Sequence, residues 1–65
     1  MLDKALEMLN ALKNDRSIPE AEISEMVDEL TGRGKELEHE IELDHFAAFE
    51  EKECWRIAGE LEKYL

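Results

Sequence analysis

One central block of like charge limits what this 65-residue chain can fold into. Between Ser17 and Glu51 the sequence carries twelve carboxylates and only two cations, whereas the flanking segments hold equal numbers of acids and bases. The net charge of -10 therefore comes from the middle of the chain. Like charges one turn apart destabilise a helix, and repulsion within a small domain costs stability. Acids that are kept at this cost indicate a role for the acidic surface.

Length and composition predict one domain, residues 1–65, with a single small core. Apolar residues make up 43% of the chain. A domain of this size buries only ~60% of the surface that its unfolded chain exposes, so its margin of stability is thin. The aromatic residues all lie in the last third of the chain, and we expect the core to be built largely around them. They are Phe46, Phe49, Trp55 and Tyr64.

The cysteine and hydropathy patterns predict a cytoplasmic protein. The single Cys54 excludes an internal disulfide, as is usual in a reducing compartment. No apolar run approaches the ~20 residues that span a bilayer, and the N-terminus lacks the basic and apolar regions of a signal peptide. Nucleic acids and anionic membranes would repel a chain of this charge, so we expect neither to bind it directly. The expected partner is basic.

The first predicted element is an amphipathic helix over residues 2–14, where apolar side chains recur at helical spacing. A break follows over residues 15–19. Ser17 is predicted to begin a second helix, because residues 17–20 (Ser-Ile-Pro-Glu) have the form of a capping box and proline is tolerated in a first turn. Gly32 is the predicted end of this helix. Its apolar stripe consists of Ile23, Met26, Val27 and Leu30.

Residues 36–43 allow two interpretations. Their apolar and acidic residues alternate strictly, apart from a histidine, which is a strand pattern. Glu and Leu are good helix formers, however, and β-branched residues are few in this segment. An isolated strand would have to pair with a second chain, which leaves a homodimer open beside a monomer. We favour a helix, although it would place Glu36 and Glu40 one turn apart.

The last predicted helix begins after Asp44, which can cap its first turn. Phe49 and Trp55 are expected at the borders of its apolar face. The residues expected to face inward are Phe46, Ala47, Cys54, Ile57, Ala58, Leu61, Tyr64 and Leu65. The complete pattern predicts an all-α fold: a small compact bundle of three to four helices, with residues 36–43 as a short strand in the alternative.

No motif indicates an enzyme site, a metal site or a cofactor. Residues 36–39 and 42–45 match the E-x-x-H spacing of di-iron bundles. Those bundles place the motif on two separate helices and add further inward-facing glutamates. Cys54 follows several glutamates, and a reactive thiol needs electropositive surroundings. We therefore interpret Cys54 as a small core residue.

The acidic surface is the remaining candidate site. Carboxylates on one face of a strand repeat every ~6.7 Å, and neighbours on one side of a helix lie ~5–6 Å apart. Both spacings resemble the regular negative charge of a nucleic-acid backbone, so a rigid acidic body can occupy a Lys/Arg-lined DNA channel. The carboxylates expected to contact a partner are Glu36, Glu38, Glu40, Glu42 and Asp44, followed by Glu22, Glu25, Asp28 and Glu29.

In its length, acidity, lone Cys54 and helical pattern, the chain resembles the small acidic anti-CRISPR proteins of phages and mobile elements. The resemblance is to inhibitors of type I effector complexes, type I-C included. Several members of that class are similar to DNA in surface charge and block target-DNA binding by occupying a basic surface of a Cascade-type subunit. The resemblance implies a non-enzymatic inhibitor that acts in the cytoplasm of a bacterial host. It also implies that carboxylates of residues 20–29 and 36–51 make the contact.

The alternative is a helical interaction module, such as an antitoxin or a dimeric regulator, that binds through apolar surface. Residues 36–43 would then pair between chains. Charge reversals would matter little in that case, whereas aspartate in place of Leu37, Ile41 or Leu43 would abolish binding.

Overall fold

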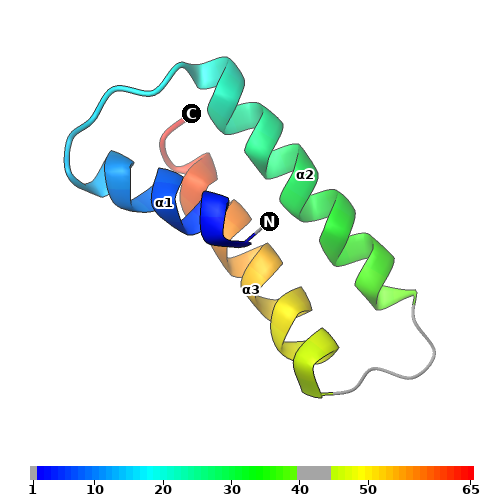
Figure 1. The fold of residues 1–65 in the computed structure, drawn as a ribbon. Coiled ribbons are helices and arrows are strands. Elements are labelled where there is room, and N and C mark those ends of the chain that lie inside the picture. Colours follow the sequence, from blue (N-terminus) through cyan, green and yellow to red (C-terminus); the bar gives the residue numbers. More distant parts are fainter. Residues whose placement is uncertain (1, 40–44) are drawn as a thin grey trace.

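The described part of the chain folds into three helices and contains no strand. The computed structural model describes residues 2–39 and 45–65. Its helices are α1 (Leu2–Lys13), α2 (Glu20–Glu38) and α3 (His45–Glu62). The two longer helices, α2 and α3, run antiparallel and make most of the contacts between helices, and α1 packs mainly against α3 (Figure 1). The predicted all-α bundle is confirmed.

The first helix ends as its sequence dictates. Asp15 adopts a left-handed conformation with φ 61°, which Asp tolerates better than most residues because its short side chain bonds locally. The amide of Arg16 donates to the Ala11 carbonyl at 3.0 Å, and the amide of Asp15 donates to the Leu12 carbonyl at 3.2 Å. These two bonds form a Schellman motif, which satisfies carbonyls at the end of the helix. The predicted helix over residues 2–14 is thus confirmed to within one residue.

The predicted capping box at Ser17 is wrong. Helix α2 begins at Glu20, its N-cap is Pro19 with φ -56°, and no side chain caps it. The Pro19 carbonyl instead accepts bonds from the amides of Glu22 and Ile23. The physical reason is the proline, whose ring disfavours the helical conformation for the residue before it. Ser17 therefore stays outside the helix.

The predicted end of the second helix at Gly32 is also wrong. Helix α2 passes through Gly32 and Gly34 and continues to Glu38, so the first residues of the ambiguous segment 36–43 are helical. Residues 40–43 of that segment lie outside the described residues, as does the proposed cap Asp44. A Cβ on Gly34 would lie 2.7 Å from Trp55 Cε2. Gly34 is therefore a point of close helix packing, and this packing outweighs the low helix propensity of glycine.

The core is aliphatic. It forms one cluster to which all three helices contribute. The predicted core role of Cys54 is confirmed, since this residue is fully buried. The fully buried bulky side chains besides Cys54 are Ile23, Leu30, Leu37, Ile57 and Leu61.

The prediction of a core built around the aromatic residues is wrong. Phe46 is 83% exposed and Phe49 is 62% exposed. Tyr64 and Leu65, both predicted to face inward, are also exposed, while Trp55 is half-buried against Gly34. The reason is the length of the covering helix: α1 has 12 residues, against 18 for α3. One end of α3 therefore extends past α1.

We predict that Gly34→Ala destabilises the domain and that Gly32→Ala stabilises it. Overpacking at a close helix contact costs about 1–3 kcal/mol, more than the up to ~1 kcal/mol that alanine contributes to a helix interior. A Cβ on Gly32 meets no atom within 4 Å, so Gly32→Ala measures the effect of helix propensity on stability without any packing effect. Urea unfolding followed by Trp55 fluorescence measures both effects. Equal stabilisation by the two substitutions would contradict the close packing.

Candidate functional site

Helix α2 separates its residues into a buried stripe and an acidic outer surface. The buried residues recur three and four positions apart and face the core. We use the name α2 acidic face for the exposed carboxylates in the N-terminal half of this helix. These residues are Glu20, Glu22, Glu25, Asp28 and Glu29.

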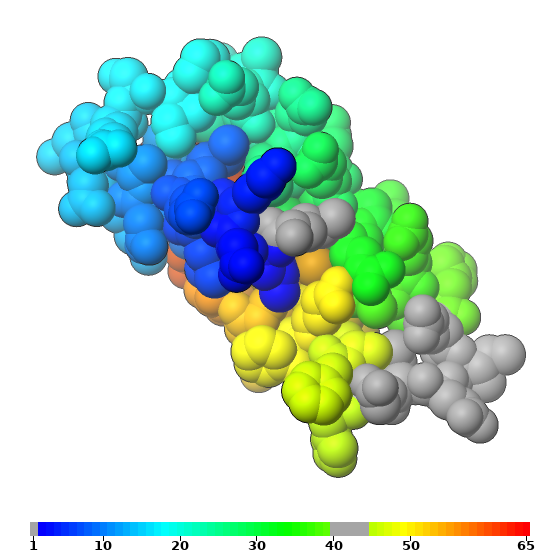
Figure 2. All heavy atoms as spheres, viewed as in Figure 1, coloured from blue at the N-terminus to red at the C-terminus, as the bar shows by residue number. Residues whose placement is uncertain are grey.

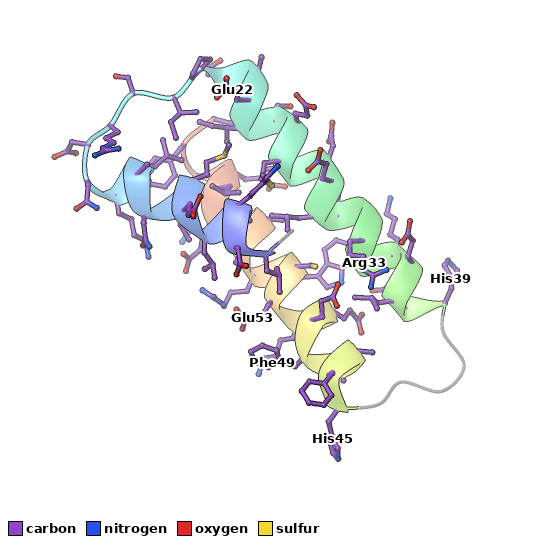
Figure 3. All side chains as sticks on the ribbon, viewed as in Figure 1. Glu22, Arg33, His39, His45, Phe49 and Glu53 are labelled. Carbon is purple, nitrogen blue, oxygen red and sulfur yellow. The ribbon has the colours of Figure 1, made fainter. Side chains whose placement is uncertain are left out.

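The α2 acidic face is not neutralised by basic side chains. Among the described residues, none of its five carboxylates forms an ion pair. Glu22, Glu25 and Glu29 line a shallow groove of about 210 Å³ between α1 and α2, opposite Lys4 and Met8. Glu22 lies near the start of α2 and is exposed to solvent (Figure 3). With Lys4 as the basic residue of this groove against three carboxylates, the surface keeps a net negative charge.

The compensated carboxylates lie elsewhere. Arg33 Nε lies 2.6 Å from a Glu50 carboxylate oxygen, and Arg33 Nη1 lies 3.3 Å from one of Glu36. Arg33, which is labelled in Figure 3, thus ties α2 to α3 through Glu50 and also shields Glu36. Lys13 Nζ lies 3.6 Å from Glu60, which ties α1 to α3. Lys13 and Arg33 thus stabilise contacts between helices, whereas the acids of the α2 acidic face are exposed to solvent.

Hydrogen bonds and burial shift the pKa values of a few groups in the described residues. Hydrogen bonds to Glu50 and Glu36 raise the pKa of the Arg33 guanidinium. The hydrogen bond from Arg56 holds the pKa of Glu53 below its usual range. Burial, and secondly the nearby Glu50 charge, raise the pKa of the Cys54 thiol. The thiol is therefore protonated and unreactive at neutral pH.

The charge spacing of α2 can be compared with that of DNA. The helix has 19 residues and carries seven carboxylates with two cations, Arg33 and Lys35. At a rise of ~1.5 Å per residue it is about 27 Å long. A single DNA strand carries roughly 8 phosphates over that length, and a duplex roughly 16. Less its two cations, helix α2 has a net charge of -5, which is below the charge of one strand over this length and far below that of a duplex.

The structure brings some of the predicted contact residues together. Glu22, Glu25, Asp28 and Glu29 share the α2 acidic face. Glu36 and Glu38 are exposed at the far end of α2, where Glu36 is already paired with Arg33. Three residues ranked first by the sequence lie outside the described residues: Glu40, Glu42 and Asp44.

Several apolar residues that the sequence analysis considered differ from its predictions or lie outside the described residues. Leu37, one of the apolar contact residues in the alternative interpretation, is 2% exposed and belongs to the interior. Ile41 and Leu43 lie outside the described residues. Sequence reasoning missed the exposure of Phe46 and Phe49. The signal for it was present in the unequal lengths of the predicted first and last helices.

No group of three or more metal-ligating side chains occurs within residues 2–39 and 45–65. In the same residues no helix combines the length and apolar character needed to cross a membrane. Comparison with protein-family models, curated proteins and solved structures gives no match. Function must therefore be argued from the surface itself.

We predict that Arg33→Gln lowers the melting temperature more than Arg56→Gln does. Both arginines pair with two carboxylates, but only Arg33 connects two helices, because Glu53 and Glu60 lie on α3 with Arg56. Removing Arg33 also leaves Glu36 and Glu50 without their cation. Adding Glu50→Gln to Arg33→Gln should recover part of the loss, as thermal unfolding by circular dichroism would detect. Equal effects of the two arginine substitutions would contradict a linking role for Arg33.

We predict that Cys54 reacts with iodoacetamide at pH 8 only after the domain unfolds. The residue is fully buried and its thiol pKa is raised, so the native protein offers neither access nor thiolate. A raised pKa also means that this group contributes stability below its unfolded pKa and that the contribution is lost as pH rises through the folded value. Mass spectrometry of samples in buffer and in urea gives the two labelling rates. Rapid labelling of the native protein would refute the buried position.

Proposed function

We propose that this protein is a non-enzymatic inhibitor whose α2 acidic face occupies a basic nucleic-acid-binding site of another protein. The single observation that carries the proposal is the set of five exposed carboxylates with no ion pair in the described residues. Within the described residues, each basic side chain that forms an ion pair does so with a carboxylate outside this face. A surface left uncompensated in this way favours a cationic partner.

The spacing of the charges supports a site built for nucleic acid. Helix α2 holds its carboxylates along one rigid axis, with a net negative charge closer to that of one DNA strand than to that of a duplex. Binding of α2 in a cationic channel would release counterions into solution, as binding of DNA does. A net charge closer to that of one strand than to that of a duplex favours a channel or groove that follows a single backbone.

The proposed partner is a CRISPR effector of the Cascade type in the cytoplasm of a bacterial host. This choice rests on the resemblance in size, acidity and helical pattern to small anti-CRISPR proteins. Binding would block the effector from its target DNA. Steering by opposite charges would make association fast and strongly dependent on salt.

We predict that Glu22→Gln/Glu25→Gln/Glu29→Gln weakens inhibition of target-DNA binding by roughly tenfold or more, since three lost pairs at about 0.5 kcal/mol each amount to that factor. Inhibition is measured as the protein concentration that halves the binding of labelled target DNA to a purified Cascade-type complex. The measurement is repeated at several salt concentrations. The triple variant should also show a shallower dependence on salt.

A matched control removes the same number of charges from other exposed positions: Glu7→Gln/Asp15→Asn/Glu62→Gln. It should inhibit nearly as well as the wild type. Equal loss in the control and in the α2 variant would refute a role for this particular face. Absence of inhibition by the wild type would refute the choice of a CRISPR partner.

A further inference from the structure

Helix α1 covers only part of the α2–α3 pair. It is 12 residues long, or about 18 Å, whereas α2 and α3 are each about 27 Å long. Lys4 and Met8 of α1 lie opposite Glu22, Glu25 and Glu29, all in the first half of α2. Figure 2 shows α1 over the part of the bundle where α2 begins and α3 ends. The other end of the pair has no helix over it in the described residues.

We use the name uncovered end for residues 33–38 of α2 and residues 45–53 of α3. Two bulky aromatic side chains, Phe46 and Phe49, are exposed there. They lie three residues apart on α3, so they are neighbours on one side of the helix. In Figure 3 Phe49 points away from α2, on the same visible face as α1. Single exposed apolar residues are common, but an adjacent pair of phenylalanines marks an interaction surface.

Charged side chains border this aromatic pair. Glu50 is paired with Arg33, and Glu53 accepts hydrogen bonds from Arg56. The charges cancel within each pair, although the uncovered end as a whole has five acids against three bases and keeps a net negative charge. An apolar centre with a polar rim is the usual anatomy of a protein–protein interface.

The uncovered end is joined to the α2 acidic face by a row of carboxylates, which we call the acidic side of α2. Glu22, Glu29 and Glu36 are spaced seven residues apart, so they follow one side of the helix. Glu22 and Glu29 line the groove beside α1, and Glu36 contacts Arg33 in the uncovered end. A partner seated on the acidic side therefore reaches the aromatic pair without leaving this face of the molecule.

We propose that Phe46 and Phe49 are the apolar anchor for a basic protein partner that presents apolar side chains between its lysines and arginines. This inference rests on the proposed function, and it adds the second half of the interface. Charge decides the occupant: a second copy of the chain would bring another net charge of -10 against the first. Helix α1 gives an example of such a contact within the protein, because its basic Lys4 and apolar Met8 lie beside carboxylates of α2.

Two synthetic basic peptides of equal length and charge test the anchor. One carries leucine at its apolar positions and the other carries alanine at the same positions. Calorimetric titration gives the affinity of each for the wild type, for Phe46→Ser/Phe49→Ser and for Glu22→Gln/Glu25→Gln/Glu29→Gln. Both phenylalanines are exposed, so their replacement leaves the core intact, and circular dichroism verifies the fold. Leu65→Ser, which removes an exposed apolar residue at the other end of α3, is the control.

We expect the wild type to bind the leucine peptide about tenfold more tightly than the alanine peptide, as two buried anchor side chains would provide. The double phenylalanine variant should lose this preference and keep its affinity for the alanine peptide. The carboxylate variant should bind both peptides more weakly, and Leu65→Ser should match the wild type.

A leucine preference that survives in Phe46→Ser/Phe49→Ser would overturn the anchor and leave the proposed function standing. Carboxylate substitutions without effect on either peptide would instead overturn the proposed function. Sedimentation equilibrium tests the remaining possible occupant of the phenylalanine pair, a second copy of this chain. A wild-type dimer that becomes monomeric in the double phenylalanine variant would show that a second copy covers the pair, and would overturn the basic partner.

Discussion

The close contact between α2 and α3 at Gly34 and Trp55 is the constraint on which the rest of this structure depends. Only a residue without a side chain lets the indole lie this near the α2 backbone. The two long helices can then bury Leu30, Leu37 and Ile57 between them. In a domain of this size the buried area is small, so a contact that brings two helices close together has a large share in the total stability. Arg33 reinforces it by pairing with Glu50 across the same two helices.

The ion pairs of the described residues separate the carboxylates into two groups: those that pair with a base and stabilise the fold, and those of α2 that face solvent without a paired base. Basic side chains pair with Glu36, Glu50, Glu53 and Glu60, either within α2 or α3 or between helices. The carboxylates from Glu20 to Glu29 receive no ion pair in the described residues, although they repel one another along one helix. A protein selected for stability alone would intersperse the two signs on this surface. The separation of signs is the physical basis for proposing a cationic partner.

The short α1 shapes the second part of the surface. Because it ends before the α2–α3 pair does, the core closes over Ile57 and Leu61 but not over Phe46 and Phe49. Arg33, which ties the two long helices together, pairs with Glu36 of α2 and with Glu50, the residue that follows Phe49 on α3. Apolar area contributes affinity that does not depend on salt, and charge contributes steering and specificity. An interface with both would combine fast association with slow release.

The sequence by itself determined the helical class, the first helix and its end, the inward stripe of Ile23, Met26, Val27 and Leu30, the buried position of Cys54 and the exposed acids of α2. These features follow from periodicity and charge, which act within one helix. Only the tertiary structure decided that α2 continues through Gly32 and Gly34, because the reason is a contact with Trp55 on another helix. It also decided that Phe46 and Phe49 face solvent, since an apolar residue is buried only where a second element covers it, and α1 does not reach that far. Local pattern specifies which side of a helix can be buried, and packing between helices decides how much of that side is.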